Sequence, residues 1–176
     1  MADVGEAGGG LVVGHVEAFI TGGRSRRYEP EVRIFEVQNQ ETNERFTVGI
    51  ESDDRRFAIS LPPGDYRLNR VQINEGPFMS MAQLTAAFSV KSDVVTYLGI
   101  WRFGVDSPRY GRMVALSMIQ DDGDQSQADT LVRGYYPSVE GRPLVAVIPE
   151  PSHIQTRLYE VMPYPRYPRY FQRHVW

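Results

Sequence analysis

The sequence contains no cysteine, so the protein can form no disulfide, no thiolate nucleophile and no thiolate metal site. It contains a single lysine, Lys91, against 18 arginines. It also has no apolar run that approaches the roughly 20 residues of a membrane-spanning helix. These absences exclude cysteine-dependent enzymes and disulfide-stapled scaffolds, and they predict a chain without a transmembrane helix.

The composition otherwise matches an ordinary folded domain. Of the 176 residues, 41% are hydrophobic and 11% aromatic, which is enough for one packed core without covalent staples. We expect a flexible leader at residues 1–10, a single β-sandwich domain at residues 11–148, and a tail rich in proline, tyrosine and arginine at residues 149–176.

The leader bears on the location of the protein. It reads MADVGEAGGG, with two acids, no basic residue and no apolar stretch, which is unlike a secretory signal. We therefore expect a cytoplasmic protein if Met1 is native, associated with a membrane only through a partner. We expect a periplasmic protein if an export signal was removed.

Charge is distributed unevenly along the chain. The formal net charge is −3, but residues 151–176 carry four arginines and one glutamate, so this segment has a net charge of +3 and the rest of the chain −6. An acidic body with a basic tail is expected, and the acidic body argues against a general nucleic-acid binder.

Short segments rich in β-branched and aromatic residues recur between turn formers, as in an antiparallel β-sandwich. The predicted strands are residues 11–20, 32–38, 45–51, 56–61, 65–73, 83–90, 94–103 and 112–119, with a short edge strand at 144–148. Pro149 and Pro151 should then end regular structure. The predicted fold class is mainly β: an antiparallel sandwich, immunoglobulin-like or transthyretin-like, with one short helix and an extended C-terminal tail.

Between the strands at 56–61 and 65–73 lies the turn Pro62-Pro63-Gly64-Asp65. Proline suits the second position of a type II turn, and Gly64 can supply the positive φ of the third. We therefore expect a hairpin here. In the flanking strand the period of two places alternate residues on the core. We expect one core that contains Phe57, Ile59, Leu61, Tyr66, Leu68, Tyr97, Leu98 and Trp101, and the same period turns Phe46, Val48 and Ile50 inward.

The segment 94–103 is apolar on both faces, which predicts a central strand covered on both sides. Strict alternation assigns Val95, Tyr97, Trp101 and Phe103 to one face and Val94, Leu98 and Ile100 to the other.

One helix is predicted near residues 124–134. Asp124 can cap its first amides, and Gln127 occupies the capping-box position. The helix should dock on the sandwich through an apolar stripe of Ala128, Leu131, Val132 and Tyr135.

Several residue sets that could suggest chemistry have simpler interpretations. Asp121, Asp122 and Asp124 lack the spacing of a calcium loop and fit a solvated turn with a helix cap. The histidines His15, His153 and His174 lie in no ligand pattern, and no G-x-S-x-G nucleophile motif occurs. We expect no catalytic residue, no cofactor and no metal.

The C-terminal segment contains a repeated Tyr-Pro-Arg unit that suits extended polyproline II geometry. Such a segment can be disordered, can pack on its own acidic body, or can dock on a partner. The predicted partner-binding residues are Tyr164, Arg166, Tyr167, Arg169, Tyr170, Phe171 and Trp176.

The hairpin sequence FAISLPPGDYRL at residues 57–68 resembles carboxypeptidase regulatory-like and transthyretin-like β-sandwich domains, in which a strand often ends before P-x-G-x-Y. Residues 96–99, TYLG, are similar to a later strand of small bacterial lipoprotein-type sandwich domains. The resemblance covers residues 11–120 and implies a noncatalytic module.

These observations predict a non-catalytic, protein-binding accessory subunit that docks through its tail on a larger assembly, either membrane-associated or not. Two alternatives stay open. The sandwich could bind a small ligand or carbohydrate on Trp101, Tyr97 or Tyr110, or the arginines and tyrosines of the tail could bind single-stranded nucleic acid.

Overall fold

The computed structural model describes residues 9–21, 28–50, 55–106, 114–121, 125–147 and 153–160. These residues form ten strands, one α-helix and one 3-10 helix. In chain order they are β1 (Gly10–Ile20), β2 (Pro30–Asn39), β3 (Arg45–Gly49), β4 (Arg56–Leu61), β5 (Gly64–Glu75), β6 (Phe78–Val90), β7 (Val95–Asp106), β8 (Val114–Asp121), α1 (Gln125–Tyr135), η1 (Pro137–Val139), β9 (Leu144–Ala146) and β10 (His153–Glu160).

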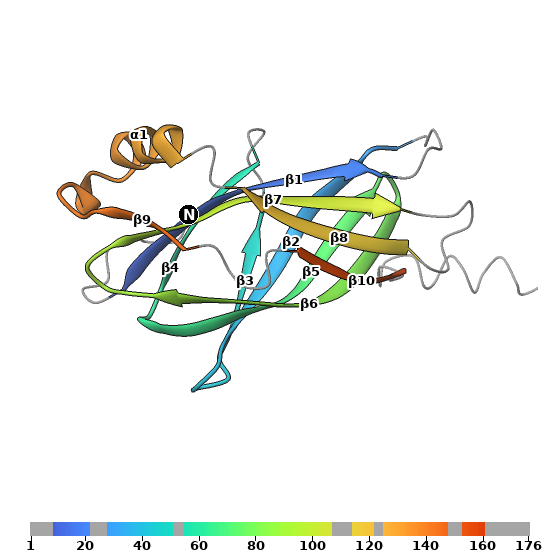
Figure 1. Cartoon of the computed structure of the whole chain (residues 1–176), viewed down its shortest axis with the longest axis horizontal. Coiled ribbons are helices and arrows are strands. Elements are labelled where there is room, and N and C mark those ends of the chain that lie inside the picture. Colours follow the sequence, from blue (N-terminus) through green and yellow to red (C-terminus); the bar gives the residue numbers. More distant parts are fainter. Residues whose placement is uncertain are drawn as a thin grey trace, which may run out of the picture.

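The predicted sandwich with one short α-helix is confirmed. The strands pair in the order β3-β2-β5-β6-β10-β8-β7-β1-β4, with β9 also paired to β7. This path folds over so that β3, β2, β5 and β6 form one layer and β8, β7, β1 and β4 form the other, as Figure 1 shows. Most pairs are antiparallel, but β7 runs parallel to both β1 and β9, which alternation along single strands does not reveal.

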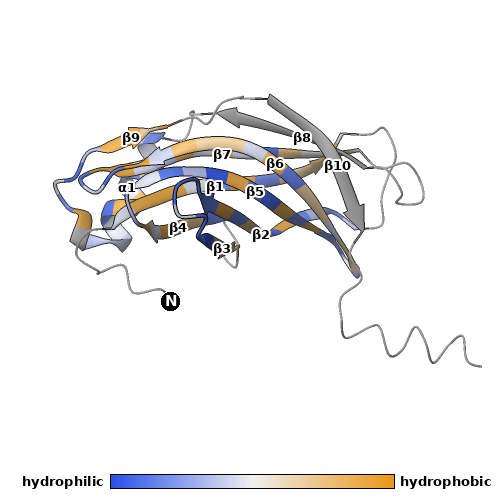
Figure 2. Ribbon diagram, turned by 90° about the horizontal axis from the view of Figure 1, so that it is seen from below, coloured by the Kyte–Doolittle hydropathy of each residue, from blue (hydrophilic) through white to orange (hydrophobic). Residues whose placement is uncertain are grey.

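The main core lies between the two layers. An aromatic group at its centre joins Phe35 of β2, Phe57 of β4 and Trp101 of β7, with ring centroids 4.7 to 5.6 Å apart. The predicted inward alternation in β3 and β4 is confirmed, and hydrophobic and hydrophilic residues alternate along the strands in Figure 2. Large aromatic rings from both layers thus hold the two sheets together.

The predicted hairpin after β4 is wrong. Gly64 has a positive φ, but at +152° it is far from the roughly +80° of a type II turn. In addition, β4 pairs with β1 whereas β5 pairs with β2 and β6. The turn therefore carries the chain from one layer to the other, and we call it the arch. Tyr66 closes it by donating a hydrogen bond from its hydroxyl to the Pro62 carbonyl oxygen, 2.7 Å away, in the manner of the tyrosine corner of β-sandwiches.

Strand β7 is central, as predicted, but its two faces are not those of strict alternation. The pairing between β1 and β7 shifts register around Gly99, which has a φ of +74°. This β-bulge moves Leu98 onto the same face as Trp101, because the extra residue reverses the alternation beyond it.

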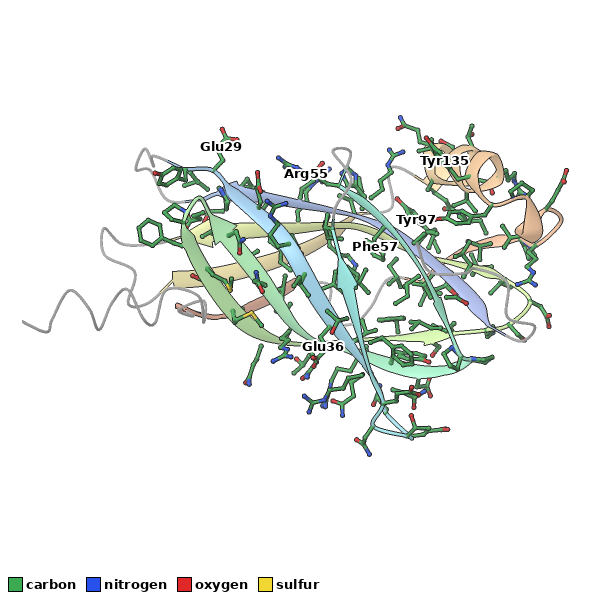
Figure 3. The ribbon with its side chains drawn as sticks, turned by 180° about the vertical axis from the view of Figure 1, so that it is seen from behind. Glu29, Glu36, Arg55, Phe57, Tyr97 and Tyr135 are labelled. Atoms are coloured by element: carbon green, nitrogen blue, oxygen red, sulfur yellow. The ribbon has the colours of Figure 1, made fainter. Side chains whose placement is uncertain are left out.

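A second, smaller core lies on the outer face of β1 and β7 beneath helix α1. Its buried members are Leu11, Val13, Val95, Tyr97, Ala128, Val132 and Val139. The expectation of one core containing Tyr97 is therefore wrong, because Tyr97 faces α1 and not the other layer (Figure 3). The helix docks as predicted through Ala128 and Val132, but Tyr135 is 75% exposed and does not belong to the buried stripe.

We expected regular structure to end at Pro149 and Pro151, and this prediction is wrong. Strand β10 follows them, within the segment predicted as a tail, and it pairs with β8 and with β6. Prolines outside a strand do not prevent the next residues from joining a sheet. At the other end of the chain Gly10, expected to close the leader, is the first residue of β1.

Candidate partner-binding surfaces

The predicted binding residues of the tail, Tyr164, Arg166, Tyr167, Arg169, Tyr170, Phe171 and Trp176, lie outside the described residues. The structure does fix the point from which that segment leaves the body. The last residue of β10, Glu160, pairs with Ser80 near the start of β6. Residues 161–176 therefore continue from the end of the sandwich at which β6 begins, opposite the end that carries α1 (Figure 1).

This end of the sandwich, which we call the tail-bearing end, exposes aromatic side chains. Phe78, the first residue of β6, is 52% exposed. Beside it the Tyr28 ring packs so closely on Gly76 that an added Cβ there would lie 2.6 Å from the ring. Phe19, at the same end of β1, is 40% exposed. Large exposed apolar side chains that gather on one surface are typical of binding sites, and Phe78 and Phe19 lie at the same end of the sandwich on different layers.

A second surface is the outer face of β3, β2 and β5, where a buried carboxylate holds several polar side chains. The Glu36 side chain is 5% exposed. Its oxygens accept hydrogen bonds from Asn69 Nδ2 at 2.7 Å and Arg70 at 2.6 Å, and Arg45 lies 3.6 Å away. Arg67 reaches the Gln38 side chain on the same face. We call Arg45, Arg67 and Arg70 the arginine face; Figure 3 labels Glu36, the carboxylate of this surface.

A third polar group lies on the outer face of β1 and β7, beyond the part that α1 covers. Arg102 pairs with Glu17 at 3.1 Å, and the His15 imidazole lies 3.9 Å from the same carboxylate. The His15 side chain is 17% exposed, so the imidazole is partly buried. The Arg102–Glu17 pair joins β7 to β1, as cross-strand pairs on an outer sheet face commonly do.

Two of the proposed ligand platforms are closed. Trp101 and Tyr97 are completely buried, and the Trp101 indole donates to the Leu98 carbonyl oxygen at 2.9 Å. Neither ring can therefore stack on a sugar in this conformation. The third platform, Tyr110, and the carboxylates Asp122 and Asp124 lie outside the described residues.

The pKa of the buried Tyr66 hydroxyl is displaced from its ordinary value. Burial raises the pKa of its hydroxyl, the hydrogen bond with Asn39 lowers it less, and the negative charge of Glu44 adds to the rise. A neutral hydroxyl that closes the arch has a structural role.

Within the described parts of the chain no group of three or more histidine or acidic residues could hold a metal ion. Over the same residues no helix is long and apolar enough to cross a membrane.

Sequence reasoning missed the exposed aromatic residues of the tail-bearing end and the arginine face. Phe78 lies in a stretch that we had assigned to no strand. The arginine face has a signal in the sequence, since Glu36, Gln38 and Arg67 occupy polar positions next to apolar ones, but only the pairing of β2 with both β3 and β5 brings them together.

Comparison with known proteins found no match: no family model, no curated protein and no solved structure matches the chain. The resemblance to carboxypeptidase regulatory-like and transthyretin-like domains therefore stays a prediction, based on the motif at residues 57–68.

Proposed function

We propose that the chain is a non-catalytic, protein-binding accessory subunit that docks on a larger assembly through residues 161–176. The observation that supports this most directly is the anchorage of β10. It pairs with β8 over His153–Leu158 and with β6 over Leu158–Glu160, so the segment that follows starts from a fixed point. At that point Glu160 pairs with Ser80, two residues from the exposed Phe78, so an aromatic side chain of the body lies near the start of the tail.

The composition of the segment favours docking on a protein. Prolines at 163, 165 and 168 restrict the backbone, so ordering the segment on a partner loses less entropy than ordering a flexible chain. Its tyrosines, Trp176 and arginines are the residue types that dominate binding energy at interfaces. Tyrosine and tryptophan also settle at the headgroup level of bilayers, so we favour a membrane-embedded partner.

Truncation tests the proposal. A chain that ends at Glu160 keeps all ten strands and should keep the melting temperature of the full chain, yet it should lose the partner that the full chain captures from the native membrane fraction. A matched control carries the same sixteen tail residues in scrambled order, which preserves charge and aromatic content. The scrambled tail should lose the partner as well. Capture of the same partner by the truncated chain would refute docking through the tail.

A further inference from the structure

The arginine face combines a buried negative charge with exposed positive ones. Glu36 is almost fully removed from water, whereas the side chains of Arg45 and Arg70 are 57% and 47% exposed and Arg67 is exposed as well. Three guanidinium groups thus accompany one carboxylate, which leaves a net charge of +2 at the centre of this sheet face. The protein as a whole has a net charge of −3, so the face opposes the overall sign.

Stability alone does not require a charge at position 36. An apolar side chain of similar volume usually stabilises such a site as well as a buried ion pair does, because burying a charge is costly. The carboxylate has another effect, which is to restrain its partners. Arg70 and Asn69 are hydrogen-bonded to it, and Arg45 is close. Guanidinium groups held in this way lose less side-chain entropy when they bind an anion.

The strand register spaces these groups regularly. Arg45 and Arg67 lie opposite Gln38 on either side of β2, and Arg70 lies opposite Glu36. Because neighbouring strands are about 4.8 Å apart, Arg45 and Arg67 are about 10 Å apart at their Cα atoms. In an extended peptide, acidic residues at alternate positions point to one side about 7 Å apart. Arginine side chains are long enough to cover the difference between the spacing of the arginines and the spacing of the acidic residues in the peptide.

We infer that the arginine face binds an acidic polypeptide segment in extended conformation, with carboxylates at alternate positions that pair with Arg45, Arg67 and Arg70. This site is separate from the proposed tail-docking function. The choice of a polypeptide follows from charge complementarity and from the flat, polar face of a sheet, where successive carboxylates can each meet a guanidinium fork. The acidic residues Asp65, Glu41 and Glu44 lie toward the β2–β3 turn and limit the site at that side.

Fluorescence anisotropy on the full chain tests the inference, with a labelled peptide that alternates glutamate and threonine. The double variant Arg45→Gln/Arg67→Gln removes two guanidinium groups and leaves Glu36 bonded to Asn69 and Arg70, so the fold should persist. Exposed charge pairs are individually weak, so we expect the affinity to fall about fivefold to tenfold at low ionic strength. The wild-type affinity should also weaken as salt rises.

The matched control is Arg166→Gln/Arg169→Gln, which makes the same charge change in the tail and should bind the peptide as the wild type does. A peptide that alternates glutamine and threonine should not bind. Equal binding by Arg45→Gln/Arg67→Gln and the wild type would overturn the inference. So would loss of binding in the tail variant alone, which would assign the peptide to the tail. Because partner capture depends on residues 161–176, it is scored separately and tests only the proposed function.

Discussion

Gly14 of β1 is a position at which a single methyl group should destabilise the protein. A Cβ added there would lie 2.5 Å from Phe57 Cζ, 2.8 Å from Phe57 Cε1 and 3.3 Å from the Gly99 carbonyl oxygen. The Phe57 ring cannot easily withdraw, because Phe35 and Trp101 bracket it with centroids at 4.7 and 5.6 Å. Gly14 therefore makes room for the central aromatic group, across from the bulge at Gly99.

Two opposing effects set the magnitude of Gly14→Ala. Overpacking a filled core costs about 1 to 3 kcal/mol. Replacing glycine in a strand gains about 0.5 to 1 kcal/mol, chiefly by restricting the unfolded chain. We expect a net loss of about 1 to 2 kcal/mol in the free energy of unfolding. For a protein of this size, that loss corresponds to a fall of about 3 to 6 °C in melting temperature.

Urea denaturation followed by tryptophan fluorescence measures this loss, since Trp101 is fully buried in the native state. The variant Gly134→Ala is a matched control, because nothing lies within 4 Å of a Cβ added at that helical position. It should stabilise by about 0.5 to 1 kcal/mol. In the Phe57→Leu background, Gly14→Ala should lose at least about 1 kcal/mol of its effect. If Gly14→Ala is as stable as the wild type, or if Phe57→Leu does not relieve it, the close packing described here is wrong.

Three further predictions concern the arch, the helix and the last strand. Tyr66→Phe removes the hydrogen bond to Pro62 and should cost about 1 kcal/mol near neutral pH. Folding raises the pKa of Tyr66, so the contribution of its neutral hydroxyl to the free energy of unfolding is complete below about pH 10 and declines above it. In urea titrations at alkaline pH, the stability of Tyr66→Phe should therefore fall less with rising pH than that of the wild type. Val132→Ala should cost about 1 to 3 kcal/mol in thermal melts, whereas Tyr135→Ser should change stability by less than about 0.5 kcal/mol; equal losses would contradict the docking of α1. Ending the chain at residue 152 removes β10 and should abolish the cooperative thermal transition that a chain ending at Glu160 retains.

The sequence was most informative where local pattern decides structure. Alternation identified the inward residues of β3 and β4, and the apolar stripe located α1, because burial of one face leaves a regular signal. The turn sequence at the arch also predicted the positive sign of φ at Gly64. A turn signal reports that the chain reverses, however, and says nothing about which strand each arm will pair with.

The features that were not predicted depend on distant parts of the chain. The bulge at Gly99 lies in the pairing of β7 with β1, more than 80 residues earlier in the chain, so alternation along β7 alone placed Leu98 and Trp101 on opposite faces. Tyr135 continues the helical period but lies past the edge of the surface that β1 and β7 offer. Strand β10 has an apolar alternation at Ile154 and Leu158, which the flanking prolines obscured.

The position of β10 between β6 and β8 has a consequence for biosynthesis. During translation β6 and β8 are both complete before β10 emerges, and at about 5 to 20 residues per second the delay after β8 is about 2 to 8 s. For that interval the two halves of the sandwich present unpaired strand edges, each a template for association with other nascent chains. Pairing of β10 with β6 and β8 then covers both edges, so the last strand to be synthesised among those described also joins the two halves of the sheet.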